Sequence, residues 1–76
     1  MKELVEYIAT ALVDDADAVR VQEVEKGGST VIELVVAKED VGKVVGKHGR
    51  TAKAIRTLLS VSSAKHGKRA GLEIIE

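Results

Sequence analysis

A seven-residue stretch near the middle of the chain, Val44-Val45-Gly46-Lys47-His48-Gly49-Arg50, holds the residue types best suited to chemistry. Its two glycines lack a Cβ, so the backbone there can take a positive φ and approach another backbone closely. A helix predicted to follow the second glycine would direct its unpaired N–H groups and the positive end of its dipole at this loop. Such a corner suits a phosphate oxygen. Hydrogen-bonding and cationic side chains stand at the same place: Lys47, His48 and Arg50.

The charge distribution decides between this interpretation and a merely tight connection between two helices. The formal net charge is zero, but residues 1–37 hold three basic and eight acidic side chains, a balance of −5. Residues 38–76 hold nine basic and four acidic side chains, a balance of +5. Residues 41–70 contain eight Lys or Arg and no acid, whereas a solvated helix face normally mixes both signs. This basic block, which includes Lys43 and Lys53, favours a polyanionic partner.

The remaining polar residues do not form a catalytic constellation. His48 and His66 are the only side chains that titrate near neutrality, and the serines at 60, 62 and 63 have no evident triad partner. Gly42 and Gly46 are separated by three residues, where a nucleotide-binding P-loop needs four. The sequence therefore predicts a protein that is not an enzyme and needs no cofactor.

A metal site is not predicted either. Asp14, Asp15 and Asp17 lie close together, but no glycine-centred ligand loop accompanies them, so they are expected in a connecting loop. The chain has no cysteine and therefore no thiolate ligands.

Length and hydropathy bound the architecture and the compartment. Seventy-six residues make one small domain, here taken as residues 1–76. The absence of cysteine suits a reducing compartment, no apolar run is long enough to span a bilayer, and the N-terminus lacks a secretion pattern. We expect a cytoplasmic protein with no membrane association.

Hydrophobic periodicity predicts the first half of the chain. Apolar residues at helical spacing indicate an amphipathic helix over residues 2–13. Residues 19–25 read as a strand, and Lys26-Gly27-Gly28-Ser29 as a hairpin loop. Residues 30–37 form the strongest strand, with apolar side chains on both faces, and are expected at the centre of a sheet.

The second half reads as two helices and a strand. A short helix is predicted over residues 41–45, capped by Glu39 or Asp40, and a longer one over residues 50–65 with Gly67 as its stop. Residues 72–75 form a final strand. In the long helix, the residues expected to face the sheet are Ile55, Leu58, Leu59 and Ser62.

The resulting order, α-β-β-α-α-β, fixes the fold class. Two strands joined by a two-helix crossover are expected to be parallel, and the hairpin adds an antiparallel neighbour. We therefore expect an α+β domain in which a three-stranded mixed sheet carries three helices on one face.

Residues 44–55 read Val-Val-Gly-Lys-His-Gly-Arg-Thr-Ala-Lys-Ala-Ile. This stretch resembles the motif apolar-Ile-Gly-x-x-Gly-x-x-Ile-x-x-Ile of KH domains, and the order of elements that of their second topological type. Both loop glycines and Ile55 match, Val45 replaces an isoleucine, and Ala52 occupies another isoleucine position. The flanking residues 40–43 and Arg56, with the small size, make the chain similar to stand-alone bacterial KH proteins of the KhpA type.

The resemblance implies RNA binding, dimerisation and partnership with a larger KhpB (Jag-like) KH protein. It implies that single-stranded RNA is clamped by its phosphate backbone at Gly46-Lys47-His48-Gly49, in a post-transcriptional regulator or RNA chaperone. Composition agrees, because Tyr7 is the one aromatic residue and folds that stack bases on several rings are disfavoured. The full set of expected RNA-binding residues is Lys43, Gly46, Lys47, His48, Gly49, Arg50 and Lys53.

The long helix also predicts a homodimer. Its apolar sector is wider than the roughly 100° stripe that packing on one sheet requires, and the expected interface residues are Ala54, Leu58 and Val61. The sequence also fits an alternative, a protein-interaction module whose basic face binds a protein partner and whose RNA binding is incidental.

Overall fold

The computed structural model describes residues 1–65, 67 and 69–75. Three α-helices and three strands follow one another as α1 (Lys2–Leu12), β1 (Arg20–Lys26), β2 (Ser29–Val35), α2 (Val41–Val45), α3 (Arg50–Ala64) and β3 (Arg69–Ile75). Short 3-10 turns, η1 (Ala16–Ala18), η2 (Lys38–Asp40) and η3 (Lys47–Gly49), connect them. The predicted order is confirmed.

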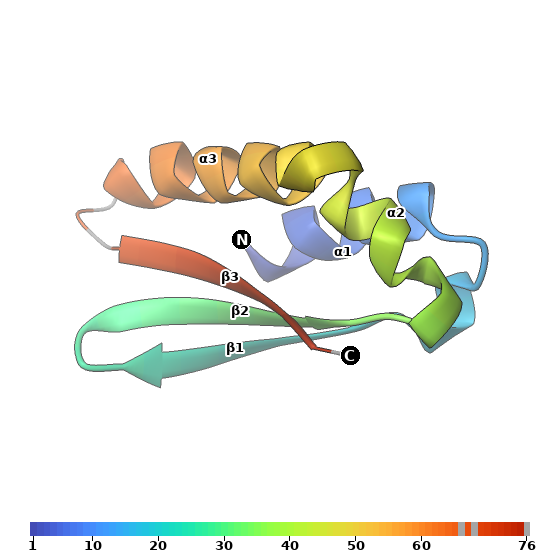
Figure 1. The fold of residues 1–76 in the computed structure, drawn as a ribbon. Helices are drawn as coiled ribbons and strands as arrows, with labels where there is room; N and C mark the ends of the chain where they lie inside the picture. Colours follow the sequence, from blue (N-terminus) through green and yellow to red (C-terminus); the bar gives the residue numbers. More distant parts are fainter. Residues whose placement is uncertain (66, 68, 76) are drawn as a thin grey trace.

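The strands form one mixed sheet in the order β1-β2-β3. β1 runs antiparallel to β2, and β2 runs parallel to β3. The helices lie together on one side of this sheet, with α3 along β3 and α2 at the end where α3 begins (Figure 1). The expected α+β fold with a central second strand is confirmed.

The hairpin turn has the backbone that its two glycines permit. Lys26 pairs with Ser29, so Gly27 and Gly28 alone make the connection. Their φ angles of 53° and 84° are both positive, as the two central residues of a tight hairpin turn require.

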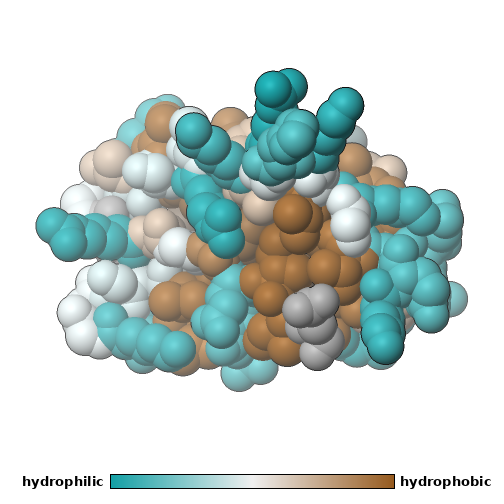
Figure 2. Space-filling model, in the orientation of Figure 1, coloured by the Kyte–Doolittle hydropathy of each residue, from teal (hydrophilic) through white to brown (hydrophobic). Residues whose placement is uncertain are grey.

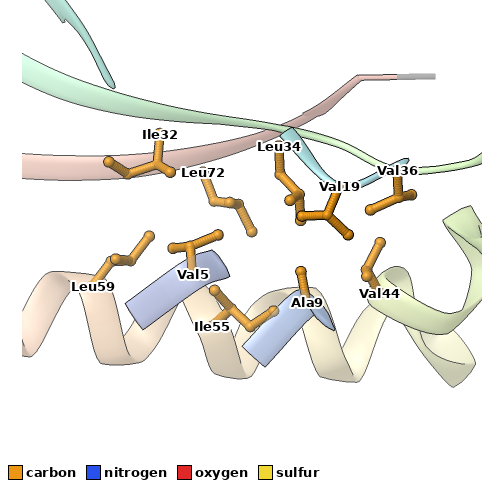
Figure 3. Close-up of a cluster of buried hydrophobic side chains, with 10 residues drawn as sticks. All are labelled: Val5, Ala9, Val19, Ile32, Leu34, Val36, Val44, Ile55, Leu59 and Leu72. Carbon is orange, nitrogen blue, oxygen red and sulfur yellow. The ribbon is translucent and has the colours of Figure 1, made fainter. Parts of the chain in front are cut away.

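The core lies between the sheet and the helices. Every second residue of β2 is buried, and the side chains of Ile32 and Leu34 face those of α1 and α3 (Figure 3). The apolar residues on the other side of β2, Val31 and Val35, are half-buried because the helices cover only one face. The core consists of Val5, Ala9, Val19, Ile32, Leu34, Val36, Val44, Ile55, Leu59 and Leu72.

The expected sheet-facing side of the long helix is partly wrong. Ile55 and Leu59 are buried as predicted, but Leu58 is 49% exposed. Successive residues differ by about 100° around a helix, so a strip centred between Ile55 and Leu59 leaves Leu58 at its flank. Ser62 is half-buried, whereas the neighbouring Ser63 is fully buried and donates to the Ser60 carbonyl.

Two smaller expectations also change. β2 ends at Val35, two residues earlier than predicted, because its partners Arg20 and Ile75 are the last residues that pair with it. Asp40 does stand at the N-cap of α2, but its carboxylate bonds to other groups instead of capping the helix.

Within the described part of the chain, no helix combines the length and the apolar composition needed to cross a membrane.

Candidate nucleic-acid interface

The loop between α2 and α3 is closed by its own backbone. The Gly46 N–H donates to the Gly42 carbonyl at 2.9 Å and ends α2, and the Gly49 N–H donates to the Gly46 carbonyl at 3.1 Å. Gly46 has φ 79° and ψ 171°, and Gly49 has φ 73°. Both glycines therefore have the positive φ that the sequence predicted for this loop.

Gly46 is needed for a second reason, which is its closeness to α3. A Cβ added there would lie 2.7 Å from the Cβ of Thr51 and 2.9 Å from its backbone nitrogen. No atom lies within 4 Å of the corresponding position on Gly49. The first glycine thus allows α2 and α3 to approach, and the second supplies only the turn.

His48 has a backbone conformation that the sequence did not indicate. Its φ of 58° and ψ of 24° put it in the left-handed region, which costs a residue with a Cβ free energy. The turn it makes directs the chain into α3 while both His48 and Lys47 stay exposed. Such strain persists only where the surrounding structure imposes it, and it is common at ligand-binding loops.

Cations continue from the loop along α3. Arg50 and Lys53 are exposed and stand three residues apart, so they are neighbours on the helix surface. Arg56 follows at the same spacing, and its guanidinium donates to the Leu72 carbonyl of β3 at 3.5 Å. The predicted RNA-binding residues do not include Arg56, which continues the three-residue spacing of Arg50 and Lys53.

Lys43 differs from the other predicted cations. Its ammonium forms ion pairs with the carboxylates of Asp14 and Asp40, the latter at 3.0 Å. The backbone N–H of Asp15 donates to the other oxygen of Asp40, also at 3.0 Å. Lys43 therefore lies near the loop and also binds the connection that follows α1.

These contacts shift the pKa values of both partners. The N–H of Asp15, followed by the Lys43 ammonium, holds the pKa of Asp40 below its ordinary value. The carboxylate of Asp14, followed by that of Asp40, raises the pKa of Lys43. Both groups are therefore charged near neutral pH.

Among the described residues, no three His, Cys, Asp or Glu side chains lie close enough together to hold a metal ion.

The tertiary structure divides the basic block. Lys65 and Arg69 lie at the C-terminal end of α3 and the start of β3, beyond a helix of 15 residues. At 1.5 Å per residue such a helix is roughly 22 Å long. His66 and Lys68, in the same block, lie outside the described residues. The cations near the loop are thus a subset of the block.

An aliphatic surface adjoins the loop. Figure 2 shows an apolar area between α2 and the C-terminal end of β3. Half-buried apolar side chains come from both elements: Val41, Val45 and Ile74. The Gly46–Gly49 loop and an apolar surface therefore occupy the same end of the molecule.

The predicted dimer residues of α3 are all exposed. Leu58 is 49% and Val61 is 56% exposed, and Ala54 is exposed beside them. Around the helix these three lie together, on the flank opposite Arg56. An exposed apolar strip on a helix marks a candidate contact surface.

Comparison with known proteins places this geometry in a family. The family model described as "KhpA/KhpB, KH domain" matches residues 2–74. The chain is 56% identical over 75 residues to RNA-binding protein KhpA of Caldanaerobacter subterraneus subsp. tengcongensis, covering 99% of this chain and 100% of the relative. It is 53% identical over 76 residues to RNA-binding protein KhpA of Halalkalibacterium halodurans, covering 100% of both. RNA-binding protein KhpA of Aquifex aeolicus is 50% identical over 76 residues, 100% of this chain and 96% of the relative.

No solved structure matches the chain. The family model matches almost the whole chain. The alignments with the relatives from Caldanaerobacter and Halalkalibacterium cover the full length of each relative. The sequence resemblance to KH domains is thereby confirmed, and the chain belongs to the KhpA/KhpB family of KH-domain proteins.

Proposed function

We propose that this protein binds single-stranded RNA by clamping its phosphate backbone at Gly46-Lys47-His48-Gly49. The observation that carries the proposal is the loop itself, in which two glycines turn the chain so that Lys47 and His48 are exposed at the start of α3. The N–H groups of the first turn of α3 and the flanking Arg50 and Lys53 add attraction for phosphate. The relatives are named as RNA-binding proteins, which supports RNA as the ligand.

An aliphatic surface beside this loop is suited to contact the bases of the RNA. Val41, Val45 and Ile74 are half-buried and aliphatic, which suits a KH groove that holds unstacked bases without aromatic rings. A role as post-transcriptional regulator or RNA chaperone fits such binding, because contacts to the backbone tolerate many sequences.

The double variant Lys47→Asp/His48→Asp tests the proposal. Two carboxylates at the loop would repel phosphate and would accept the hydrogen bonds of the N–H groups at the start of α3. Because the side chains of Lys47 and His48 are both exposed, the fold is expected to persist. Fluorescence anisotropy with a short 5′-labelled oligo(U) should show loss of binding, while circular dichroism stays unchanged.

The control is Lys2→Asp/Lys26→Asp, which removes more positive charge than the test pair from positions on α1 and β1. We expect this control to bind within about threefold of wild type, because neither residue belongs to the loop or to α3 and salt screens the interactions of exposed charges. Near wild-type affinity in the loop variant would show that the site lies elsewhere.

A homodimer through α3 is the second part of the proposal. The strip of Ala54, Leu58 and Val61 pairs with itself around a two-fold axis, which leaves both loops open. Two linked sites then raise the apparent affinity for longer RNA through effective concentration. The same strip is the surface that a larger KhpB-like KH protein would use in a heterodimer.

A further inference from the structure

One buried charge lies outside the proposed RNA contacts. The Asp40 side chain is 3% exposed, yet its lowered pKa keeps it ionised. A buried carboxylate is costly unless it is paired and hydrogen-bonded. Asp40 meets this requirement with the Asp15 N–H and the Lys43 ammonium, each at 3.0 Å.

This network joins segments that are distant in the sequence. Asp14 and Asp15 follow α1, Asp40 closes η2, and Lys43 lies in the middle of α2. Lys43 stands three residues before Gly46, so a bond that fixes α2 also fixes the start of the loop. A helix of five residues has few bonds of its own and depends on such tertiary contacts for its orientation.

We propose that Asp40, acting through Lys43 and the Asp15 N–H, is a positioning residue for RNA binding. It holds α2 against the connection after α1 and so keeps the Gly46–Gly49 loop in its binding conformation. Lys43 then acts as part of this brace, with its charge already balanced by Asp14 and Asp40, and makes no phosphate contact. The inference rests on the proposed function of the loop.

The first test separates a brace from a phosphate contact. Lys43→Met keeps the aliphatic stem and removes the ammonium, and Asp40→Asn keeps an acceptor for the Asp15 N–H and removes the charge. We expect each to weaken oligo(U) binding by about threefold to tenfold, because the loop spends less time in its binding conformation. The slope of log K against log salt should stay at the wild-type value for both, whereas Lys47→Met should flatten it by about 0.7.

The second test distinguishes the brace from a general loss of stability. Amide hydrogen exchange of Asp40→Asn should accelerate at the Gly46 and Gly49 N–H groups and stay at wild-type rates at Ile32 and Leu34 in the sheet, since local opening precedes global unfolding. The double variant Asp40→Asn/Lys43→Met should lose no more affinity than either single variant, because both break the same contact. Lys26→Met is the matched control and should bind as wild type.

Several results would overturn the inference. A slope flattened by about 0.7 in Lys43→Met would make Lys43 a phosphate contact. Wild-type affinity in both single variants, or equal acceleration of exchange in loop and sheet, would remove the positioning role. Lys43 has a half-exposed side chain, so Lys43→Met carries the test if Asp40→Asn does not fold. Retained RNA binding in Lys47→Asp/His48→Asp is the separate result that would refute the proposed function.

Discussion

Gly46 and Thr51 lie so close together that position 46 has no room for a side chain. An added Cβ would meet both the Cβ of Thr51, at 2.7 Å, and its backbone nitrogen, at 2.9 Å. The backbone nitrogen belongs to the first turn of α3, so a change of rotamer does not relieve the contact. The angle between α2 and α3, and with it the shape of the loop, depends on this missing side chain.

Gly46→Ala should therefore destabilise the protein markedly. Its φ of 79° and ψ of 171° lie in a region that is almost exclusive to glycine, and the clash with Thr51 adds to that strain. We expect a loss of about 2–4 kcal/mol in the free energy of unfolding, measured by urea denaturation. Gly42→Ala is the control, since no atom lies within 4 Å of its added Cβ, and it should be neutral or slightly stabilising.

His48→Gly should stabilise the fold. Glycine adopts φ 58° without the steric cost that His48 bears there, and this gain exceeds the extra entropy of the unfolded chain. We expect a rise of about 0.5–1 kcal/mol in the free energy of unfolding. Lys47→Gly, at a neighbouring position without a positive φ, should lower it. Equal effects at the two positions would contradict strain at His48.

Neutralising single cations should reveal a hierarchy in RNA affinity. Lys47→Met, Arg50→Met and Lys53→Met should each weaken binding to all sequences and flatten the log–log salt slope by about 0.7. Lys2→Met and Lys26→Met, on α1 and β1, should change neither quantity. Titrations at several salt concentrations measure both, and equal effects at all five positions would indicate diffuse attraction without a defined site.

The oligomeric state should depend on the exposed strip of α3. Leu58→Glu and Val61→Glu place a charge in a contact that would be desolvated in the dimer, whereas Ser60→Glu adds the same charge at an exposed position of α3 outside the strip. Sedimentation equilibrium at tens of micromolar should give twice the chain mass of 8.1 kDa for wild type and Ser60→Glu, and the mass of one chain for Leu58→Glu and Val61→Glu. A wild-type mass equal to one chain would rule out the homodimer.

Acid should remove the contribution of Asp40 to stability. Its folded-state pKa is lowered, first by the N–H of Asp15 and then by Lys43, so this contribution is present above its ordinary pKa and disappears as pH falls through the folded-state value. The difference in unfolding free energy between wild type and Asp40→Asn should be constant near neutral pH and shrink below about pH 4. Urea denaturation across that range measures it, and a difference that persists at the acid end would assign the effect to packing.

Patterns along the chain were enough to predict the local structure and the position of the loop. Helical periodicity and β-branched runs gave the six main elements in order, and the hairpin glycines gave the turn that Gly27 and Gly28 form. Gly46 and Gly49 were predictable because a positive φ is a local property of the backbone and glycine tolerates it best. The apolar side chains on both faces of residues 30–37 also predicted the central position that β2 has in the sheet.

How these elements face one another depends on contacts between residues that are distant in the sequence. Lys43 and Asp14 are 29 residues apart, so no pattern along the chain indicated that they pair. The rotation of α3 buries Ser63 and exposes Leu58, although leucine is the more apolar residue. The packing of the helix on the sheet decides this rotation, because the apolar sector of α3 is wider than the stripe that one contact needs. The left-handed turn at His48 likewise results from the closure of α2 onto α3, a long-range constraint that overrides the residue's own preference.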